Sequence, residues 1–279
     1  MQHMISGRNL GLITTRQTRD KWDALVSNTI ITHKSLAAYD INTIFPLYLY
    51  PSPSVGAKDL IEISEALESG AGSRRANLSE VFIRDMEKRL GLKYEEGAEE
   101  PGKKGGKKFG PDDILHYIYA VFHSPSYRER YAEFLKGDFP RVPLTSDAGL
   151  FWELCGLGSR LTALHLLEGS GPAAIKTSYP VDGSNEVDQV RYVDMHEQVQ
   201  INNDQYFGGI PKAVWEFHVG GYRVCEKWLK DRKGRKLSLD DISHYQKVVA
   251  ALAETISIMA EIDAAIMAHG GFPLWSARA

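Results

Sequence analysis

The chain has 279 residues, of which 43% are hydrophobic and 25% charged, an ordinary composition for a globular protein with a large core. Its formal net charge of −3 excludes a general attraction to polyanions, so any nucleic-acid surface must be a local patch. Two cysteines, Cys155 and Cys225, exclude a disulfide framework and fit a reducing cytosol. No apolar run approaches the roughly 20 residues that span a bilayer, and no signal-peptide pattern is present, so we expect no membrane partner.

The N-terminal region has β character. Residues 10–18, 25–32 and 44–50 are rich in β-branched or aromatic side chains, and each segment predicts a strand. Pro46 predicts an edge position or an irregular start for the third strand, because proline has no N–H to donate. Polar side chains lie in or just after these strands: Arg16, Gln17, Asn28 and Lys34. Arginine and glutamine can bind guanine and adenine edges bidentately, but exposed polar residues on a strand usually form only its solvent face.

Two helices and a loop follow. A helix is predicted over residues 58–67, and a second starts at Asn77 or Ser79 and stops at Gly91. Residues 93–110 carry an acidic block and then a basic block without periodicity, which predicts a mobile surface loop. The lysines of this loop either contact a phosphate backbone or are only solvated.

The next block is strongly helical. Pro111 and the two acids after it are typical of a helix start, and Pro125 ends this helix and begins another. The side chains expected to face inward are Ile114, Ile118, Val121 or Phe122, Tyr127, Tyr131, Phe134 and Leu135. Arg128 and Arg130 are expected on the outer face.

A further helix and several strands precede the last third of the chain. Asp147 or Ser146 caps a helix that continues to Leu167. Short strands are predicted over residues 174–179, 189–193 and 198–201.

Residues 214–238 combine a strand, a turn, a helix and a basic loop. Trp215, Phe217 and Val219 alternate as in a half-buried strand, and Gly220-Gly221 permits a tight structural turn. Residues 222–231 predict a helix, and a short loop rich in lysine and arginine follows it. Clustered cations suit a polyanion because they release its counterions, but cations also gather at the negative end of a solvated helix.

The C-terminal segment predicts one long helix. Ser238 and Asp241 form a variant of the capping box, and apolar residues then recur at heptad-like spacing. The helix continues to about residue 268, which gives a length of roughly 45 Å. One side must pack on a partner in this chain, in a second copy, or in a domain absent from it.

Several stretches match a known family pattern: residues 9–17, 45–51, 116–135, 138–145, 151–161 and 215–236. The last contains Trp-x-Phe-x-x-Gly-Gly-Tyr and Lys-Trp-Leu-Lys-x-Arg-Lys-Gly-Arg. Together they resemble the C-terminal specificity domain of type ISP (single-polypeptide type I) restriction-modification enzymes. The resemblance runs from about Asn9 to Asp263.

The resemblance implies an α+β fold, with a mixed β-sheet target-recognition domain, helical hairpins and a long C-terminal helix. It places a DNA target-recognition domain at residues 5–237, and at 238–268 a helix that packs on or links to a methyltransferase domain. The implied partners are double-stranded DNA and that methyltransferase domain, in a bacterial or archaeal cytoplasm. The implied parent enzyme would use S-adenosylmethionine, ATP and Mg, none of which we assign to this chain.

We expect phosphate contacts to position the domain and base contacts to select the site. The phosphate candidates are Lys227, Lys230, Arg232, Lys233, Arg235, Lys236, Arg128, Arg130 and Arg141. The base-reading candidates are Arg16, Gln17, Asn28 and Lys34.

No catalytic motif accompanies these residues. The sequence lacks a Gly-x-x-x-x-Gly-Lys-Ser/Thr loop, an Asn/Asp-Pro-Pro-Tyr/Phe methyltransferase motif, His-Glu-x-x-His and Cys-x-x-Cys. We therefore expect a binding domain and no catalytic residue. Two alternatives stay open: a protein-interaction module that uses the C-terminal heptad seam, and a small hydrolase whose site has no familiar signature.

Overall fold

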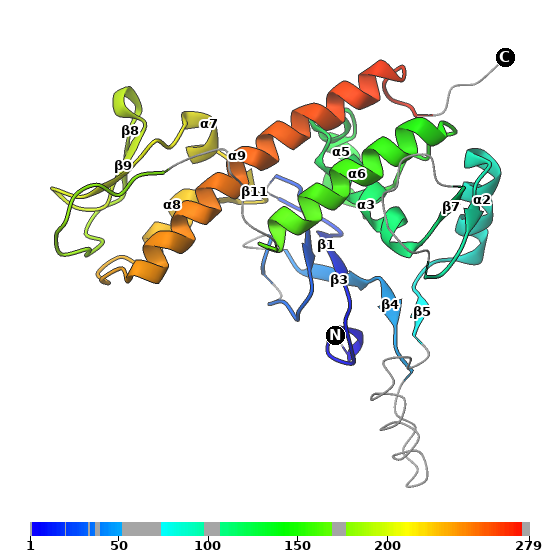
Figure 1. Ribbon diagram of the computed structural model, residues 1–279, viewed down its shortest axis with the longest axis horizontal. Coiled ribbons are helices and arrows are strands. Elements are labelled where there is room, and N and C mark those ends of the chain that lie inside the picture. The colour runs from blue at the N-terminus through cyan, green and yellow to red at the C-terminus, as the bar shows by residue number, and fades with distance from the viewer. Residues whose placement is uncertain are drawn as a thin grey trace, which may run out of the picture.

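The computed structural model describes residues 2–19, 21–32, 34–36, 40–51, 74–97, 107–168 and 177–274. The fold is α+β, with helices and several small sheets in place of one large mixed sheet (Figure 1). The helix predicted over residues 58–67 lies outside the described residues. Among the helices that are described, none is both long and apolar enough to cross a lipid bilayer.

The N-terminal region forms a three-stranded antiparallel sheet in the order β2-β1-β3, as the sequence predicted. The strands are β1 (Gly11–Thr15), β2 (Ala24–Ser27) and β3 (Asn42–Pro46), after a short 3₁₀ helix η1 (Gln2–Met4). β3 is an edge strand and ends at Pro46, which confirms the edge position expected for that proline. Beyond it, β4 (Tyr48–Leu49) pairs with β5 (Arg75–Ala76).

Capping residues mark several helix ends of the central region, as the sequence predicted. The helices are α2 (Glu80–Leu90), α3 (Pro111–His123), α4 (Pro125–Arg130), α5 (Ala132–Gly137) and α6 (Ala148–His165). Gly91 ends α2 with a left-handed φ of 67°, and Asp147 caps α6 by accepting from the N–H groups of Gly149 and Leu150. In α3 the Asp113 carboxylate accepts from the Gly110 N–H at 2.8 Å.

Three expectations in this region are wrong. Phe134 is 78% exposed, and Arg128 points inward. Phe134 is exposed because α4 ends at Tyr131 and α5 starts afresh there, so one helical phase does not extend through both segments. Arg128 turns inward because it pairs with the buried carboxylate of Asp23. The ends of the predicted loop are also structured, because β6 (Lys93–Tyr94) pairs in parallel with β7 (Lys108–Phe109). Residues 98–106 of that loop lie outside the described part of the chain.

The C-terminal region has its own small sheet in the order β10-β9-β8. Its elements are β8 (Arg191–Val193), the 3₁₀ helix η2 (Asp194–His196), β9 (Gln198–Gln200), β10 (Tyr206–Gly208), α7 (Lys212–Trp215), β11 (His218–Val219), β12 (Tyr222–Arg223) and α8 (Val224–Lys230). β8 and β9 were predicted, whereas β10 lies in a segment that the sequence indicated as a linker. The strand predicted from Trp215 is wrong in its first half, because Pro211 starts the one-turn helix α7 there.

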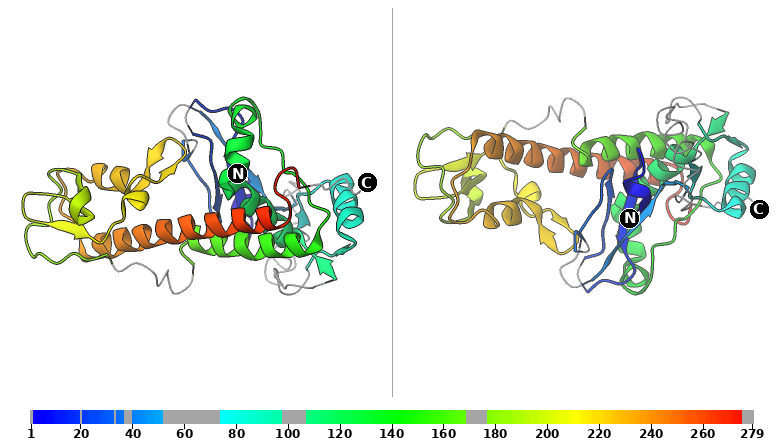
Figure 2. Two further views of the ribbon diagram at one scale, coloured as in Figure 1. Left: turned by 90° about the horizontal axis from the view of Figure 1, so that it is seen from above. Right: turned by 90° about the horizontal axis from the view of Figure 1, so that it is seen from below.

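The longest element is α9 (Leu239–Ala268), whose Ser238–Asp241 capping box is present as predicted. Figures 1 and 2 show it running from the C-terminal small sheet across the molecule and alongside α6. Its first half packs in a core cluster with β9, β10, α7 and α8, and its second half packs in a larger cluster with α3 and α6.

The heptad seam of α9 is therefore covered within this chain. Ile242, Tyr245, Val249 and Leu252 are buried in the smaller cluster, and the buried face then shifts to Ile258 and Ile262. A helix of 3.6 residues per turn drifts relative to a heptad repeat, which explains the shift. Because the seam is occupied, nothing favours the alternative of a partner-binding module built on it.

Gly220 forms the tight turn between β11 and β12. Its φ is +55°, and a Cβ there would collide with the carbonyl oxygen of Leu36. Leu36 in turn accepts from the Gly221 N–H at 3.3 Å, so the turn packs directly on the N-terminal region. Both glycines lie in this turn, and the left-handed backbone and the close approach are found at Gly220.

We predict that Gly220→Ala lowers the free energy of unfolding by about 3 kcal/mol or more, because left-handed strain adds to the collision. Gly91→Ala is the matched control: its φ is +67° but a Cβ there meets nothing within 4 Å. Its expected cost is the strain alone, about 1–2 kcal/mol. Urea denaturation measures both, and equal losses would contradict the close packing of the turn.

Candidate nucleic-acid interface

The basic loop (residues 232–236) is held on a fixed backbone. Gly234 donates to the Val187 carbonyl at 2.8 Å, Val187 donates to the Arg235 carbonyl at 3.0 Å, and Leu237 donates to Asn185 at 2.8 Å. Leu237 is buried, which anchors the end of the loop. The loop therefore forms a short strand-like pairing with the segment before β8, and its side chains project from a rigid base.

Three cations of this loop are free. Lys233, Arg235 and Lys236 are exposed, and none has a side-chain partner among the residues that the structure describes. Three positive charges within four residues, on an ordered backbone, can approach a polyanion without first breaking an ion pair.

The other predicted cations near the loop are paired. Lys227 bonds Asp231 at 2.8 Å and Lys230 bonds the half-buried Glu226 at 2.7 Å, and in each pair the residues lie one helical turn apart. Such pairs contribute little to stability, so either lysine can exchange its partner for a phosphate.

Arg232 has a structural role. Its guanidinium lies 3.5 Å from the centre of the Trp228 ring, donates to the Trp228 carbonyl at 3.1 Å, and lies 3.4 Å from Asp241. Its side chain is only 24% exposed. Phosphate contact by Arg232 would require giving up these partners.

A second group of cations lies near the hairpin end of β1 and β2. Arg16 lies 3.4 Å from the Asp138 carboxylate. The pKa of Asp138 is lowered first by the Phe139 N–H and then by Arg16, and the charge of Arg141 acts in the same direction. Arg130 and Arg141 are exposed and have no ion pair within the described part of the chain.

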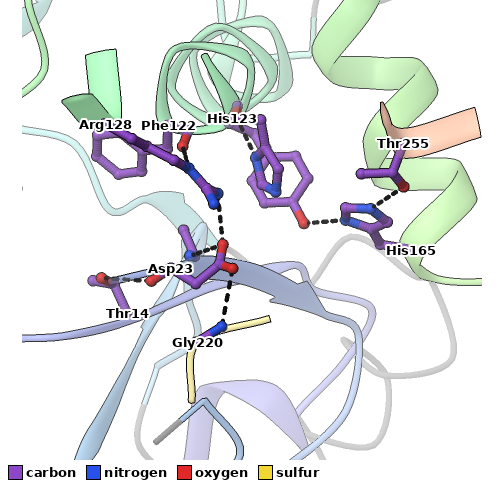
Figure 3. Close-up of polar contacts among 10 residues, drawn as sticks. Thr14, Asp23, Phe122, His123, Arg128, His165, Gly220 and Thr255 are labelled. Carbon is purple, nitrogen blue, oxygen red and sulfur yellow. Dashed lines mark hydrogen bonds and ion pairs between the residues drawn. The ribbon is translucent and has the colours of Figure 1, made fainter. Parts of the chain in front are cut away.

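Asp23 is a buried carboxylate that joins three distant segments (Figure 3). It accepts from the Ala24 N–H at 2.8 Å, from Nη2 of Arg128 at 2.5 Å, and from the Gly220 N–H at 3.0 Å. Arg128 also donates from Nε to the Phe122 carbonyl at 2.6 Å, and its side chain is 20% exposed. Arg128 therefore has internal partners and is mostly buried, and its role in phosphate contact stays a prediction.

The sequence analysis missed Asp23. A single acid in the run Trp22-Asp23-Ala24-Leu25-Val26 was the available signal, because a charge amid buried residues needs a buried partner.

The structure does not bring the four base-reading candidates to one place. Arg16 and Gln17 follow β1 at the hairpin end of the sheet, whereas Asn28 follows β2 at the opposite end, where Ser27 pairs with Gly11. Asn28 donates to Glu168 at 3.3 Å, after the end of α6. Lys34 is exposed and lines a cavity discussed below. Their role in base reading stays a prediction.

Within the described ranges, no group of three or more His, Cys, Asp or Glu side chains is placed to hold a metal ion.

Comparison with known proteins identifies similar sequences and folds. A family described as the type ISP C-terminal specificity domain matches residues 1–261. No curated protein matches the chain.

Three solved structures are similar over 92% of this chain. The DrdV–DNA complex, determined by cryo-electron microscopy, has a TM-score of 0.66 and 19% identity, and the match covers 25% of its chain. A nuclease-deletion mutant of the type ISP restriction-modification enzyme LlaGI, in complex with a DNA substrate mimic, has a TM-score of 0.59 and 17% identity, and the match covers 21% of its chain. The ATP-dependent type ISP restriction-modification enzyme LlaBIII bound to DNA has a TM-score of 0.58 and 16% identity, and the match covers 16% of its chain. At these identities the likeness shows the fold, and the chain spans a quarter or less of each of these proteins.

We predict that Arg128→Ala lowers the free energy of unfolding by about 3–5 kcal/mol, because it leaves the Asp23 charge buried without its ion-pair partner. Arg16→Ala, which removes an exposed ion pair, is the control and should leave the stability nearly unchanged. In the double variant Asp23→Asn/Arg128→Ala, part of the loss should be recovered. Chemical denaturation of the four proteins tests this, and equal stability of the two single variants would refute the role of the pair.

Proposed function

The chain belongs to the type ISP C-terminal specificity domain family, and from that premise we propose that it recognises a specific sequence in double-stranded DNA. Family membership over residues 1–261 is the observation that carries the proposal. The DNA-bound state of the three similar structures supports the same ligand. The α+β framework positions exposed cations and polar side chains, and the role of this chain is binding and not catalysis.

The free cations of the basic loop supply the phosphate contacts in this proposal. Lys233, Arg235 and Lys236 are exposed, unpaired among the described residues, and fixed to an ordered backbone. Each phosphate that they neutralise releases condensed counterions, which supplies affinity independent of sequence. Lys227 and Lys230 extend this patch along α8 when they exchange their carboxylate partners.

The cations near the hairpin end of β1 and β2, beside Asp138, supply a second set of contacts in this proposal. Arg16 follows β1, Arg130 is the last residue of α4, and Arg141 lies in the segment after α5. Arg16 and Gln17 at this end of the hairpin keep the base-reading role expected from their chemistry. Asn28 and Lys34 lie at the other end of the hairpin and would read a different part of a site.

The rest of a restriction-modification enzyme lies outside this chain. Because the similar proteins are at least about fourfold longer, modification and cleavage would belong to other parts of a parent polypeptide. We propose that the methyltransferase domain of that parent is the partner of this domain. Such a parent would be cytoplasmic and would use S-adenosylmethionine, ATP and Mg outside the residues described here.

We predict that Lys233→Ala/Lys236→Ala weakens binding to every duplex alike and reduces the magnitude of the slope of log K against log salt by about 1.8. The reason is that each lost phosphate contact removes about 0.9 from that slope. Fluorescence anisotropy between about 50 and about 200 mM salt measures it.

The matched control is Lys88→Ala/Lys93→Ala. These lysines are exposed and lie in and after α2, at the opposite end of the molecule from the basic loop (Figure 1). Their removal should leave the slope unchanged. If the two double variants behave alike, the basic loop is not the phosphate-binding surface.

A further inference from the structure

A cavity of about 570 Å³ lies between the two core clusters. Its walls come from β2, the end of α6, the β11–β12 turn, α8 and the middle of α9, and they are mostly apolar. Leu25, Leu164, Phe217, Val224, Trp228 and Leu252 are among the lining residues. This size is typical of cavities that bind small organic molecules, which lie in the range of about 300–1,000 Å³.

His123 leaves one hydrogen-bond acceptor for this cavity. The residue is 3% exposed and lines the cavity, and its Nδ1 lies 2.8 Å from the Tyr119 carbonyl oxygen. A carbonyl can only accept, so Nδ1 carries the proton. Burial lowers the pKa of His123 well below its usual value, which keeps the ring neutral. Nε2 on the opposite edge is then a bare lone pair, with no partner among the described residues.

The polar groups beside His123 form a series of hydrogen bonds that leaves no donor unpaired. Tyr119 donates its hydroxyl proton to Nδ1 of His165 at 2.5 Å, because burial raises the pKa of that hydroxyl well above its usual value. His165 then donates from Nε2 to Thr255 at 2.9 Å, and Thr255 donates to the Ala251 carbonyl at 2.8 Å. Burial lowers the pKa of His165 to about 4, so this ring is also neutral. Each donor proton in this series of hydrogen bonds has an acceptor, so Nε2 of His123 is the acceptor that remains without a donor among the described residues.

Charge at the cavity wall is balanced except at Lys34. Of the charged lining residues, Asp23 pairs with Arg128, Asp231 with Lys227, and Arg232 with Asp241. Lys34 is exposed and has no partner within the part of the chain that is described. An occupant of the cavity therefore meets a lone acceptor at His123, apolar walls, and one uncompensated cation.

We propose that this cavity is a binding site for a small, flat, mostly apolar anion, one that donates an N–H or O–H to Nε2 of His123 and directs its negative group toward Lys34. The cavity is open to solvent and its walls are mostly apolar, so a mostly apolar occupant would remove that apolar surface from water. Arg232 of the basic loop and Lys227 of α8 line part of this cavity, and binding of such an anion can be measured without DNA. Its occupant would contact both core clusters and would stabilise the junction between them.

The ligand series indole, 1-methylindole and indole-3-propionate tests the site on the unaltered protein by ¹H–¹⁵N NMR titration. Indole should bind with saturable shifts at cavity residues, and 1-methylindole, which lacks the N–H, should bind at least about fivefold more weakly. Indole-3-propionate should bind more tightly than indole at low salt, and Lys34→Ala should abolish that advantage. No saturable binding of any probe, or equal binding of indole and its methyl derivative, would overturn the proposal.

A filling variant tests the location. Val248 lines the cavity and Lys247 beside it on α9 is exposed, so Val248→Phe should reduce indole binding at least tenfold, whereas Lys247→Phe should not change it. The tenfold loss corresponds to about 1.4 kcal/mol of binding free energy. Retained affinity in folded Val248→Phe would place the probe elsewhere and overturn the assignment. If that variant does not fold, the ligand series on the unaltered protein still decides.

Discussion

The structure depends on one buried carboxylate. Asp23 accepts hydrogen bonds from its own hairpin, from Arg128 of α4 and from Gly220 of the β11–β12 turn, so three segments far apart in sequence meet at a single charge. A buried charge is stable only while its partners stay in place. Displacement of any one of these segments would leave the carboxylate buried without a partner, so the three segments hold their relative positions together. The N-terminal sheet, the α4–α5 corner and the turn that leads into α8 are thereby fixed relative to one another.

This junction gives the candidate interface its geometry. The basic loop follows α8 and is paired with the segment before β8, while Arg16, Arg130 and Arg141 belong to the region of the N-terminal sheet and the α4–α5 segment. Neither set needs to be ordered by a ligand, because hydrogen bonds and buried anchors such as Leu237 already hold the backbone. A rigid presentation of charge reduces the entropy lost on binding, which suits a domain whose proposed task is to fix the register of DNA.

Local sequence patterns predicted most of the helices, but they could not predict contacts between residues far apart in the sequence. Gly91, Asp147 and Ser238 act through the nearest backbone groups, so their caps could be predicted from the sequence. Arg128 was expected to face outward, because its partner Asp23 lies 105 residues away and no periodicity reveals that contact. The free cations of the basic loop could be predicted as a group, but their division into paired and unpaired members depends on side-chain positions that only the fold provides.

The central claim is that this chain selects a DNA sequence, and the most direct measurement is selection of bound duplexes from a randomised pool by the purified chain. We expect enrichment of one short asymmetric motif that contains an adenine, with binding that weakens as salt rises. Binding with no enriched motif would leave only an electrostatic surface and would contradict sequence recognition by this chain alone. Absence of binding at low salt would contradict the proposed function altogether.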